Sequence, residues 1–216
     1  MLDYILHPLG EAIKALPFID LFGGLILSVT RNDENRNGEI YQRTLPLSCS
    51  SNELQCESED LFRIITPNDE YRSVCYFEPD GMLETSYSTV GRVKNVLHAA
   101  GDCKFVLWLN LQKLGELIYY RTATEYFFHV RKMLSIPCNT FKHPDYNITF
   151  TIKNDLTGSS NPFEKWDFDV DQQSLIFEPF AHIYLTLHFE AYVSLNTLLA
   201  YDPKDSFSCY PNIETT

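Results

Sequence analysis

The sequence is short of cations, and this shortage excludes several classes of partner. Seventeen Lys and Arg residues face 29 Asp and Glu residues, so the formal charge is −12. Tight binding to phosphate backbones needs clustered cations, and the densest pair, Arg131-Lys132, falls on an expected solvent-facing helix. Anionic membrane surfaces would repel the same charge. We therefore expect no membrane partner and no sequence-specific binding of nucleic acid, although an acidic wall would let a strand of DNA slide past it.

Leader segments, long apolar runs and paired cysteines are lacking as well. Residues 1–20 contain acidic side chains and two prolines, which is unlike a secretory leader. The longest uncharged apolar run, 21–29, is about half of the length that would span a bilayer. The six cysteines include no Cys-x-x-Cys pair, which indicates reduced core thiols rather than a disulfide framework. These features predict synthesis in a cytoplasm.

Catalytic signatures are not found either. The sequence has only nine glycines and contains no Gly-x-Ser-x-Gly, Walker A, Gly-x-Gly-x-x-Gly or His-Glu-x-x-His motif. Three pairs of potential ligands or catalytic groups occur: His98 with Cys103 beside an expected turn, Cys138 with His143, and His182 with His188. The last pair is roughly 20 Å apart along one strand, and each other pair has only two of the three or four ligands that zinc needs. We predict a protein that is not an enzyme and binds no cofactor.

What the sequence does contain is a high aromatic content, 14%, and alternating patterns typical of strands. Helical spacing predicts a short helix at 6–16, ended by Pro17, and a capping box of Thr122 with Glu125 predicts a helix at 123–134. Strands are expected at 25–30, 40–47, 72–78, 85–97, 104–111, 146–153, 166–171 and 182–195. The prediction is a single α+β domain over residues 1–216: a mainly antiparallel sheet packed with an N-terminal helix and one central helix, followed by a polar tail at 202–216.

Four turn signals set the expected connections. Gly23-Gly24 leads into the first strand, and Asn37-Gly38 predicts a tight hairpin. Pro79-Asp80-Gly81 and residues 99–102 predict two further turns. The run at 105–109 is expected to be buried on both faces, whereas the strand at 182–195 alternates between an apolar and a polar face.

The tip of the expected hairpin resembles the beginning of a calcium-binding loop. Asp33, Asn35 and Asn37 occupy alternate positions before Gly38, as in an EF-hand. The twelfth position is Thr44 instead of the bidentate Glu, and the flanks predict strands instead of helices. A polar hairpin tip is the favoured interpretation, and the three residues are a weak calcium site at most.

A second acidic series occurs at Asp167, Asp169 and Asp171. It suggests a divalent ion, but the intervening residues are aromatic or aliphatic, as in a strand with one buried and one exposed face. Adjacent carboxylates in such a strand are about 7 Å apart, too far to share one cation closely. An exposed, charged strand face is the favoured interpretation.

The order of the expected elements resembles that of the neck and tail-completion proteins of tailed bacteriophages, including the tail terminators. The features that carry the resemblance are a leading helix, a long hairpin, a buried strand with the run 106–115 before a capped helix, and a closing strand at 174–189 before a polar tail. The resemblance implies a non-catalytic virion subunit, present in the host cytoplasm during assembly. It implies copies packed head to tail in a homo-oligomeric ring, hexameric or larger, in contact with other neck and tail proteins.

The resemblance also implies places for the acidic residues. Candidates for an interface or for the lining of a channel that passes DNA are Asp167, Asp169, Asp171, Glu53, Glu57, Glu59 and Asp60. Two alternatives stay open: a cytoplasmic β-rich ligand-binding module, calcium-dependent through Asp33, Asn35 and Asn37, and a divalent-metal enzyme that uses the series from Asp167 to Asp171.

Overall fold

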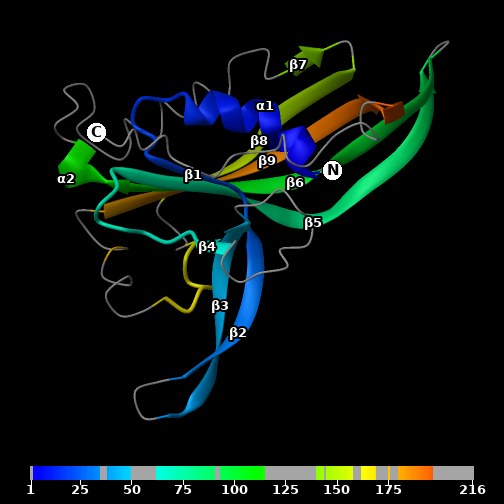
Figure 1. Ribbon diagram of the computed structural model, residues 1–216. Coiled ribbons are helices and arrows are strands. Elements are labelled where there is room, and N and C mark those ends of the chain that lie inside the picture. Colours follow the sequence, from blue (N-terminus) through cyan, green and yellow to red (C-terminus); the bar gives the residue numbers. More distant parts are fainter. Residues whose placement is uncertain are drawn as a thin grey trace, which may run out of the picture.

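A computed structural model gives the arrangement of the chain (Figure 1). It describes residues 2–34, 38–49, 62–90, 93–114, 140–143, 145–157, 162–168, 175 and 180–196. In chain order the elements are α1 (Leu2–Lys14), β1 (Leu21–Leu25), β2 (Leu27–Glu34), β3 (Ile40–Cys49), β4 (Phe62–Ile64), β5 (Ser73–Val90), β6 (Val93–Asn110), α2 (Leu111–Leu114), β7 (Thr140–His143), β8 (Tyr146–Thr157) and β9 (Phe180–Ser194).

Six strands form a curled, mixed sheet in the order β1-β5-β6-β9-β8-β7, which we call the main sheet. β1 runs parallel to β5, whereas every other neighbouring pair is antiparallel. Parallel neighbours need a long connection, and here β2, β3 and β4 lie within that connection. The α+β class is therefore confirmed at the coarse level, but the prediction of an antiparallel sheet is only partly right.

The three strands of that connection form a second, smaller sheet in the order β2-β3-β4. β2 and β3 pair from Leu27 with Leu47 to Glu34 with Ile40, so the predicted hairpin pairing is confirmed, and Gly38 has a φ of 81°. The paired ends leave five residues between them, and Asn37 of the predicted tight turn lies outside the described residues. This hairpin, residues 27–49, projects away from the main sheet (Figure 1). We call it the first arm.

Helix α1 covers one face of the main sheet (Figure 1). It begins four residues earlier than predicted, and Pro8 lies inside it. Ile5, Leu6, Leu9 and Ile13 are completely or almost completely buried against the sheet. Burial of four such side chains, at about 2 kcal/mol each, outweighs the roughly 3 kcal/mol that an internal proline costs. Packing therefore decides that this stretch is a helix.

A second layer covers part of the opposite, outer face of the main sheet. Val74 and Tyr76 of β5 and Val106 and Trp108 of β6 pack there against the small sheet and against residues 162–168. The predicted burial of 105–109 on both faces is confirmed. The odd-numbered side chains of this run are buried in the inner core, and the even-numbered ones are buried under the second layer. The predicted alternation of β9 is confirmed too, since its six inward side chains from Ile183 to Val193 are all buried.

Two predicted turns are wrong, because one glycine lies at a bulge and the other at a close ring contact, both within long strands. β5 continues through Pro79-Asp80-Gly81, where Gly81 has a φ of 88° and residues 81–83 form a bulge. β6 continues through residues 99–102, because the ring of Phe189 packs over the backbone of Gly101. A Cβ on Gly101 would lie 3.0 Å from Phe189 Cζ. The two strands instead connect between Val90 and Val93.

Other predictions are also corrected. Gly23 and Gly24 lie inside β1 and do not precede the first strand, and a Cβ on Gly23 would lie 3.0 Å from Ile65 Cγ1. The described part of the predicted strand 166–171 is turn-like, although Trp166 and Phe168 are buried and Asp167 is exposed as expected. His98 and Cys103 do not flank a turn, because both lie on β6.

The predicted central helix at 123–134 and the polar tail at 202–216 lie outside the described residues. Among the described helices, none is long and apolar enough to cross a membrane.

Candidate functional site

The outer face of the main sheet is polar where the second layer does not cover it. Ser86 of β5, His98 and Asp102 of β6, and His188 and Glu190 of β9 point to this side, because the residues between them face the inner core. We call this the open half of the outer face. It lies beyond Lys104, toward the connection between β5 and β6.

Asp102 is the centre of one group on the open half. Its Oδ1 lies 2.8 Å from His188 Nδ1, and its Oδ2 accepts a hydrogen bond of 2.9 Å from Lys153 Nζ. Burial alone would raise the pKa of Asp102, but the hydrogen bonds and charges of Lys153 and His188 outweigh it, so the pKa is lowered. Asp102 faces Asp80 across the strands, and Lys104 Nζ binds the Asp80 carboxylate at 2.8 Å. Each of these like charges is thus balanced by a lysine.

Glu190 organises a second group. Its Oε1 lies 3.1 Å from His98 Nε2 and accepts a hydrogen bond of 3.0 Å from the Tyr192 hydroxyl. The rings of His98 and Tyr192 stack with centroids 4.7 Å apart. The hydrogen bonds from Tyr192 and His98 lower the pKa of Glu190, and the same contact raises the pKa of Tyr192.

Ser86 completes a serine–histidine–carboxylate series, because its Oγ lies 3.3 Å from His98 Nδ1. A carboxylate only accepts hydrogen bonds, so a neutral His98 holds its proton on Nε2 and accepts the Ser86 hydroxyl through Nδ1. These roles match those of a nucleophile, a base and an orienting group. The three side chains stand on an exposed face, however, where water weakens the electrostatic stabilisation that acyl transfer requires. We interpret the series as cross-strand polar contacts.

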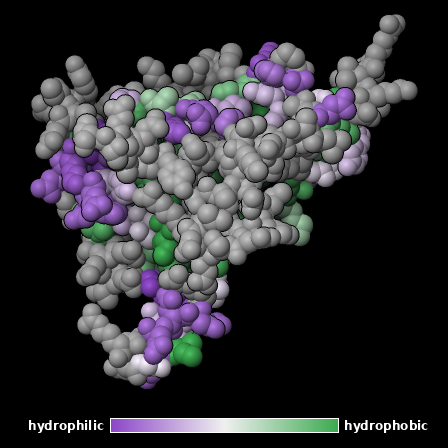
Figure 2. Space-filling view, in the orientation of Figure 1, coloured by the Kyte–Doolittle hydropathy of each residue, from purple (hydrophilic) through white to green (hydrophobic). Residues whose placement is uncertain are grey.

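Among the described residues, the large exposed apolar side chains other than Ile64 of β4 lie on two projecting hairpins. Ile40 at the end of the first arm is 74% exposed, and Leu27 and Tyr41 are exposed as well. Figure 2 shows an apolar spot among hydrophilic side chains near the free end of this arm. The far half of β5 and β6, residues 80–102, is the second arm, and here Met82 is 92% and Tyr87 80% exposed.

The second arm also presents a strand edge. β1 pairs with β5 only between Val74 and Phe77, whereas β6 follows β5 as far as Val90. In the described sheet, β5 therefore has a neighbour on one side only after residue 77. Such an edge accepts another strand by main-chain hydrogen bonds, although the bulge at Gly81 interrupts its regular part.

A short segment, residues 162–168, ties the first arm to the main sheet, and we call it the clasp. Arg43 of β3 is buried and donates two hydrogen bonds, of 2.7 and 3.0 Å, to the Asp167 carbonyl. The Asp167 carboxylate accepts the Thr44 N–H at 2.7 Å, and the Asp167 N–H donates to the Thr44 carbonyl. From the same segment, Lys165 makes an ion pair with Glu78 of β5.

The predicted ligand series are only partly described. Asp33 forms an ion pair of 3.2 Å with Arg43, while Asn35 and Asn37 lie outside the described residues. Asp167 binds Thr44 as above, whereas Asp169 and Asp171 lie outside, as do Glu53, Glu57, Glu59 and Asp60. Within the described ranges, no three His, Cys, Asp or Glu side chains are grouped so that they could hold a metal ion.

The described thiols and the remaining histidines form no shared site. Cys75 and Cys103 are free and buried, and burial raises the pKa of Cys103 to about 12, with smaller contributions from Asp102 and Asp80. His182 packs edge-on against Phe163, whereas His188 binds Asp102, so the expected separation of these two histidines holds. His143 stacks on Tyr146, and its predicted neighbour Cys138 lies outside the described residues.

Comparison of the chain with family models, with curated proteins and with solved structures gives no match.

Sequence reasoning found the polar face of β9 but not the groups built on it. Asp102 and His188 are 86 residues apart, and Ser86, His98 and Glu190 come from three strands. The misplaced turn at 99–102 separated His98 from Asp102 in the predicted fold. Continuous alternation from His98 to Lys104 was the signal that one strand carries both.

Proposed function

We propose that the chain is a non-catalytic structural subunit of a tailed bacteriophage, which assembles into a ring at the neck or tail and joins head to tail. The observation that carries the proposal is the pair of projecting hairpin arms, on which large apolar side chains are exposed. A single domain gains nothing by exposing Met82, Tyr87 and Ile40 to water, whereas a subunit covers such side chains with its neighbour.

The two arms extend from different parts of the molecule, as Figure 1 shows. A contact between the first arm of one copy and a different surface of the next copy is heterologous, and repetition of such a contact closes into a ring when the rotation fits. The free edge of β5 on the second arm supplies a further contact through strand pairing. These features support assembly through the arms.

The net charge of −12 supports a role beside DNA that does not include tight binding. An acidic wall repels the phosphate backbone and leaves the strand free to slide. Asp167, Asp169 and Asp171 and the acidic residues Glu53, Glu57, Glu59 and Asp60 remain the proposed lining or rim. Asp167 has a structural role in addition, because its carboxylate binds the first arm.

The test is the oligomeric state of the purified protein. We expect mass photometry and light scattering to give a closed oligomer of defined size, and negative-stain images to show rings. Ile40→Glu and Met82→Glu each place a charge on an arm, and we expect each to shift the population to smaller species by at least tenfold.

The matched control is Ala15→Glu, which adds the same charge at an exposed position just after α1, outside both arms. We expect this variant to assemble like the wild type. A wild-type chain that stays monomeric at all accessible concentrations, or arm variants that assemble as well as the control, would contradict the proposal.

A further inference from the structure

The main sheet has two strand edges that are open in the described part of the chain. β1 follows β5 only as far as Phe77, whereas β5 continues to Val90. β7 follows β8 only over residues 146–149, whereas β8 continues to Thr157. Beyond these points each strand has a single described neighbour, β6 or β9, and presents a row of main-chain N–H and C=O groups to the side.

The open edge of β5 has little of the protection that strand edges usually carry. Native proteins protect an edge with charged side chains, proline or a bulge. β5 has a bulge at residues 81–83 and one acidic side chain directly after it, at Glu84. The run from Thr85 to Val90 contains no charge and no proline, and it consists largely of residues that favour strands. This composition is typical of a strand that is paired on both sides.

The directions of the strands fit a contact between the two edges. Neighbours are antiparallel from β5 through β6 and β9 to β8, so β5 and β8 run in opposite directions. When a second copy is placed beside the first in the same orientation, its β5 therefore lies antiparallel to β8 of the first copy. Pairing of β5 with β5 about a two-fold axis is antiparallel too, but it ends at a dimer and leaves β8 open.

The two strands that cover the other parts of these edges fit the same contact. β1 covers the start of β5 and β7 covers the start of β8, and these starts lie toward opposite ends of the sheet (Figure 1). The open regular parts are residues 84–90 of β5 and residues 150–157 of β8. When these parts lie side by side, β7 of one copy lies beyond Val90 and β1 of the next copy lies beyond Thr157. Neither strand blocks the contact.

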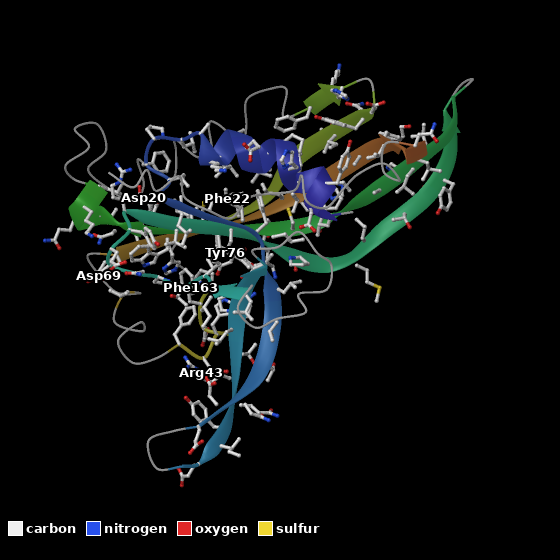
Figure 3. All side chains as sticks on the ribbon, viewed as in Figure 1. Asp20, Phe22, Arg43, Asp69, Tyr76 and Phe163 are labelled. Carbon is white, nitrogen blue, oxygen red and sulfur yellow. The ribbon has the colours of Figure 1, made fainter. Side chains whose placement is uncertain are left out.

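The described part of the second layer lies away from this edge as well. Figure 3 shows Tyr76 of β5 and Phe163 of the clasp close together, and Tyr76 belongs to the part of β5 that pairs with β1. Trp166 and Phe168 of the clasp pack in the same cluster. The clasp therefore supports the start of β5, and the open edge begins beyond it.

Side chains on the inner face of the main sheet match across the contact. Tyr87 lies in line with Leu97 and Val193, and Val193 is buried in the inner core, so Tyr87 is on the inner face. Ile152 of β8 is on the same face, because it pairs with the buried Leu187 and packs against the inner core. When the inner faces are continuous, Tyr87, which is 80% exposed in one copy, is covered by Ile152 of its neighbour.

The outer face supplies opposite charges. Glu84 is exposed and pairs with Ala100, which in turn faces Glu190 of the open half, so Glu84 is on the outer face. Lys153 is on the outer face too, because its Nζ binds Asp102, and its side chain is still 49% exposed. The contact thus brings a carboxylate of β5 and an ammonium group of β8 to the same side. A pair of β5 edges would contain no cation, since residues 84–90 include none.

We propose that the main sheet continues from copy to copy: residues 84–90 of β5 in one copy pair antiparallel with residues 150–157 of β8 in the next, with Tyr87 beside Ile152. The contact is heterologous, so each copy offers one edge to each of two neighbours, and repetition closes into a ring when the rotation fits. The inference deepens the proposed function and rests on it in one respect, the association of copies.

Hydrogen–deuterium exchange of the full chain at low and high protein concentration tests the contact. On assembly, we expect amide exchange to slow by about tenfold or more in residues 84–90 and in residues 150–157. Residues 103–109 of β6, which have neighbours on both sides within one copy, are the internal control and should not change. Slowing in 84–90 alone would indicate pairing of β5 with β5 and would overturn the proposal. Equal protection of 150–157 in the monomer would also overturn it, because the chain itself would then fill that edge.

Paired substitutions test the register. Tyr87→Lys and Ile152→Glu each place a charge in the apolar contact, and we expect each to shift the population to smaller species by about tenfold. The double variant puts opposite charges side by side, so we expect it to assemble again. The matched control combines Tyr87→Lys with Ala15→Glu, which carries the same charges apart from each other, and should stay dissociated. Equal assembly of the double variant and this control would contradict the register. Circular dichroism checks that each chain is folded, and the exchange experiment needs no variant.

The outcomes separate this inference from the proposed function. A chain that stays monomeric contradicts both. An oligomer in which exchange slows on the first arm, residues 27–49, but not in 84–90 and 150–157 overturns the strand pairing alone. Slow exchange at both edges, together with normal assembly of Ile40→Glu, supports the strand pairing and contradicts the role of the first arm.

Discussion

The two halves of the outer face of the main sheet belong to the same strands but have opposite characters. In the covered half, β5 and β6 present Val74, Tyr76, Val106 and Trp108 to the second layer. In the open half, the same two strands and β9 present serine, histidine, aspartate and glutamate. The change occurs around Glu78 and Lys104, which face each other across the strands.

This change of composition determines where the second layer is placed. An apolar face needs a cover, and the small sheet and the clasp provide it. A polar face satisfies its own side chains by cross-strand contacts and needs no cover. The covered half therefore contributes mainly stability, and the open half mainly surface chemistry. The first arm extends beyond both halves, whereas the second arm carries part of the open half, and each arm leaves large apolar side chains exposed. In our proposal a neighbouring copy covers these side chains.

The largest expected difference between the halves follows from removal of a large side chain. Trp108→Ala deletes a buried ring and its hydrogen bond to Leu175, and we expect it to lower the free energy of unfolding by about 3–5 kcal/mol. His98→Ala on the same face of the same strand should cost less than about 1 kcal/mol. Urea unfolding measures both values. Similar losses in the two variants would contradict the distinction between a covered and an open half.

An intermediate effect is expected for two cations, one that binds the clasp over the covered half and one on the open half. Arg43 is buried and binds the clasp, so Arg43→Met leaves the Asp167 carbonyl without its partner and should cost about 2 kcal/mol. Lys153 also has a carboxylate partner, but it lies on the open half, and Lys153→Met should cost less than about 1 kcal/mol. The measurement is again urea unfolding. A larger loss for Lys153→Met would reverse the comparison.

The smallest effect is a change in acid sensitivity on the open half. The pKa of Asp102 is lowered from its ordinary value of 3.8, so the folded state keeps this carboxylate charged at pH values where the unfolded chain protonates it. Its stabilising contribution is complete above pH 3.8 and is lost as the pH falls through the lower, folded pKa. In Asp102→Asn, the free energy of unfolding should therefore fall less steeply below pH 4 than in the wild type. Parallel curves for the two proteins would contradict this assignment.

Features that depend only on residues close together in the sequence could be predicted from it. The helix at the N-terminus, the hairpin of β2 and β3, the buried run at 105–109 and the two faces of β9 were all expected, because each follows from a local period or turn signal. The same logic failed at Gly81 and Gly101, since a glycine that permits a bulge or a close ring contact gives the same signal as a turn glycine.

By itself, the sequence determined which side chains are buried along the run 105–109 and along β9, and how acidic the chain is, because alternation and composition are local properties. Only the tertiary structure decided that β1 lies parallel to β5, that the clasp closes over Tyr76 and binds Arg43, and that Asp102 meets His188. These contacts join residues between 52 and 124 positions apart in the chain, by their residue numbers. Local patterns contain no information about such pairs, because their partners are chosen by the packing of whole layers.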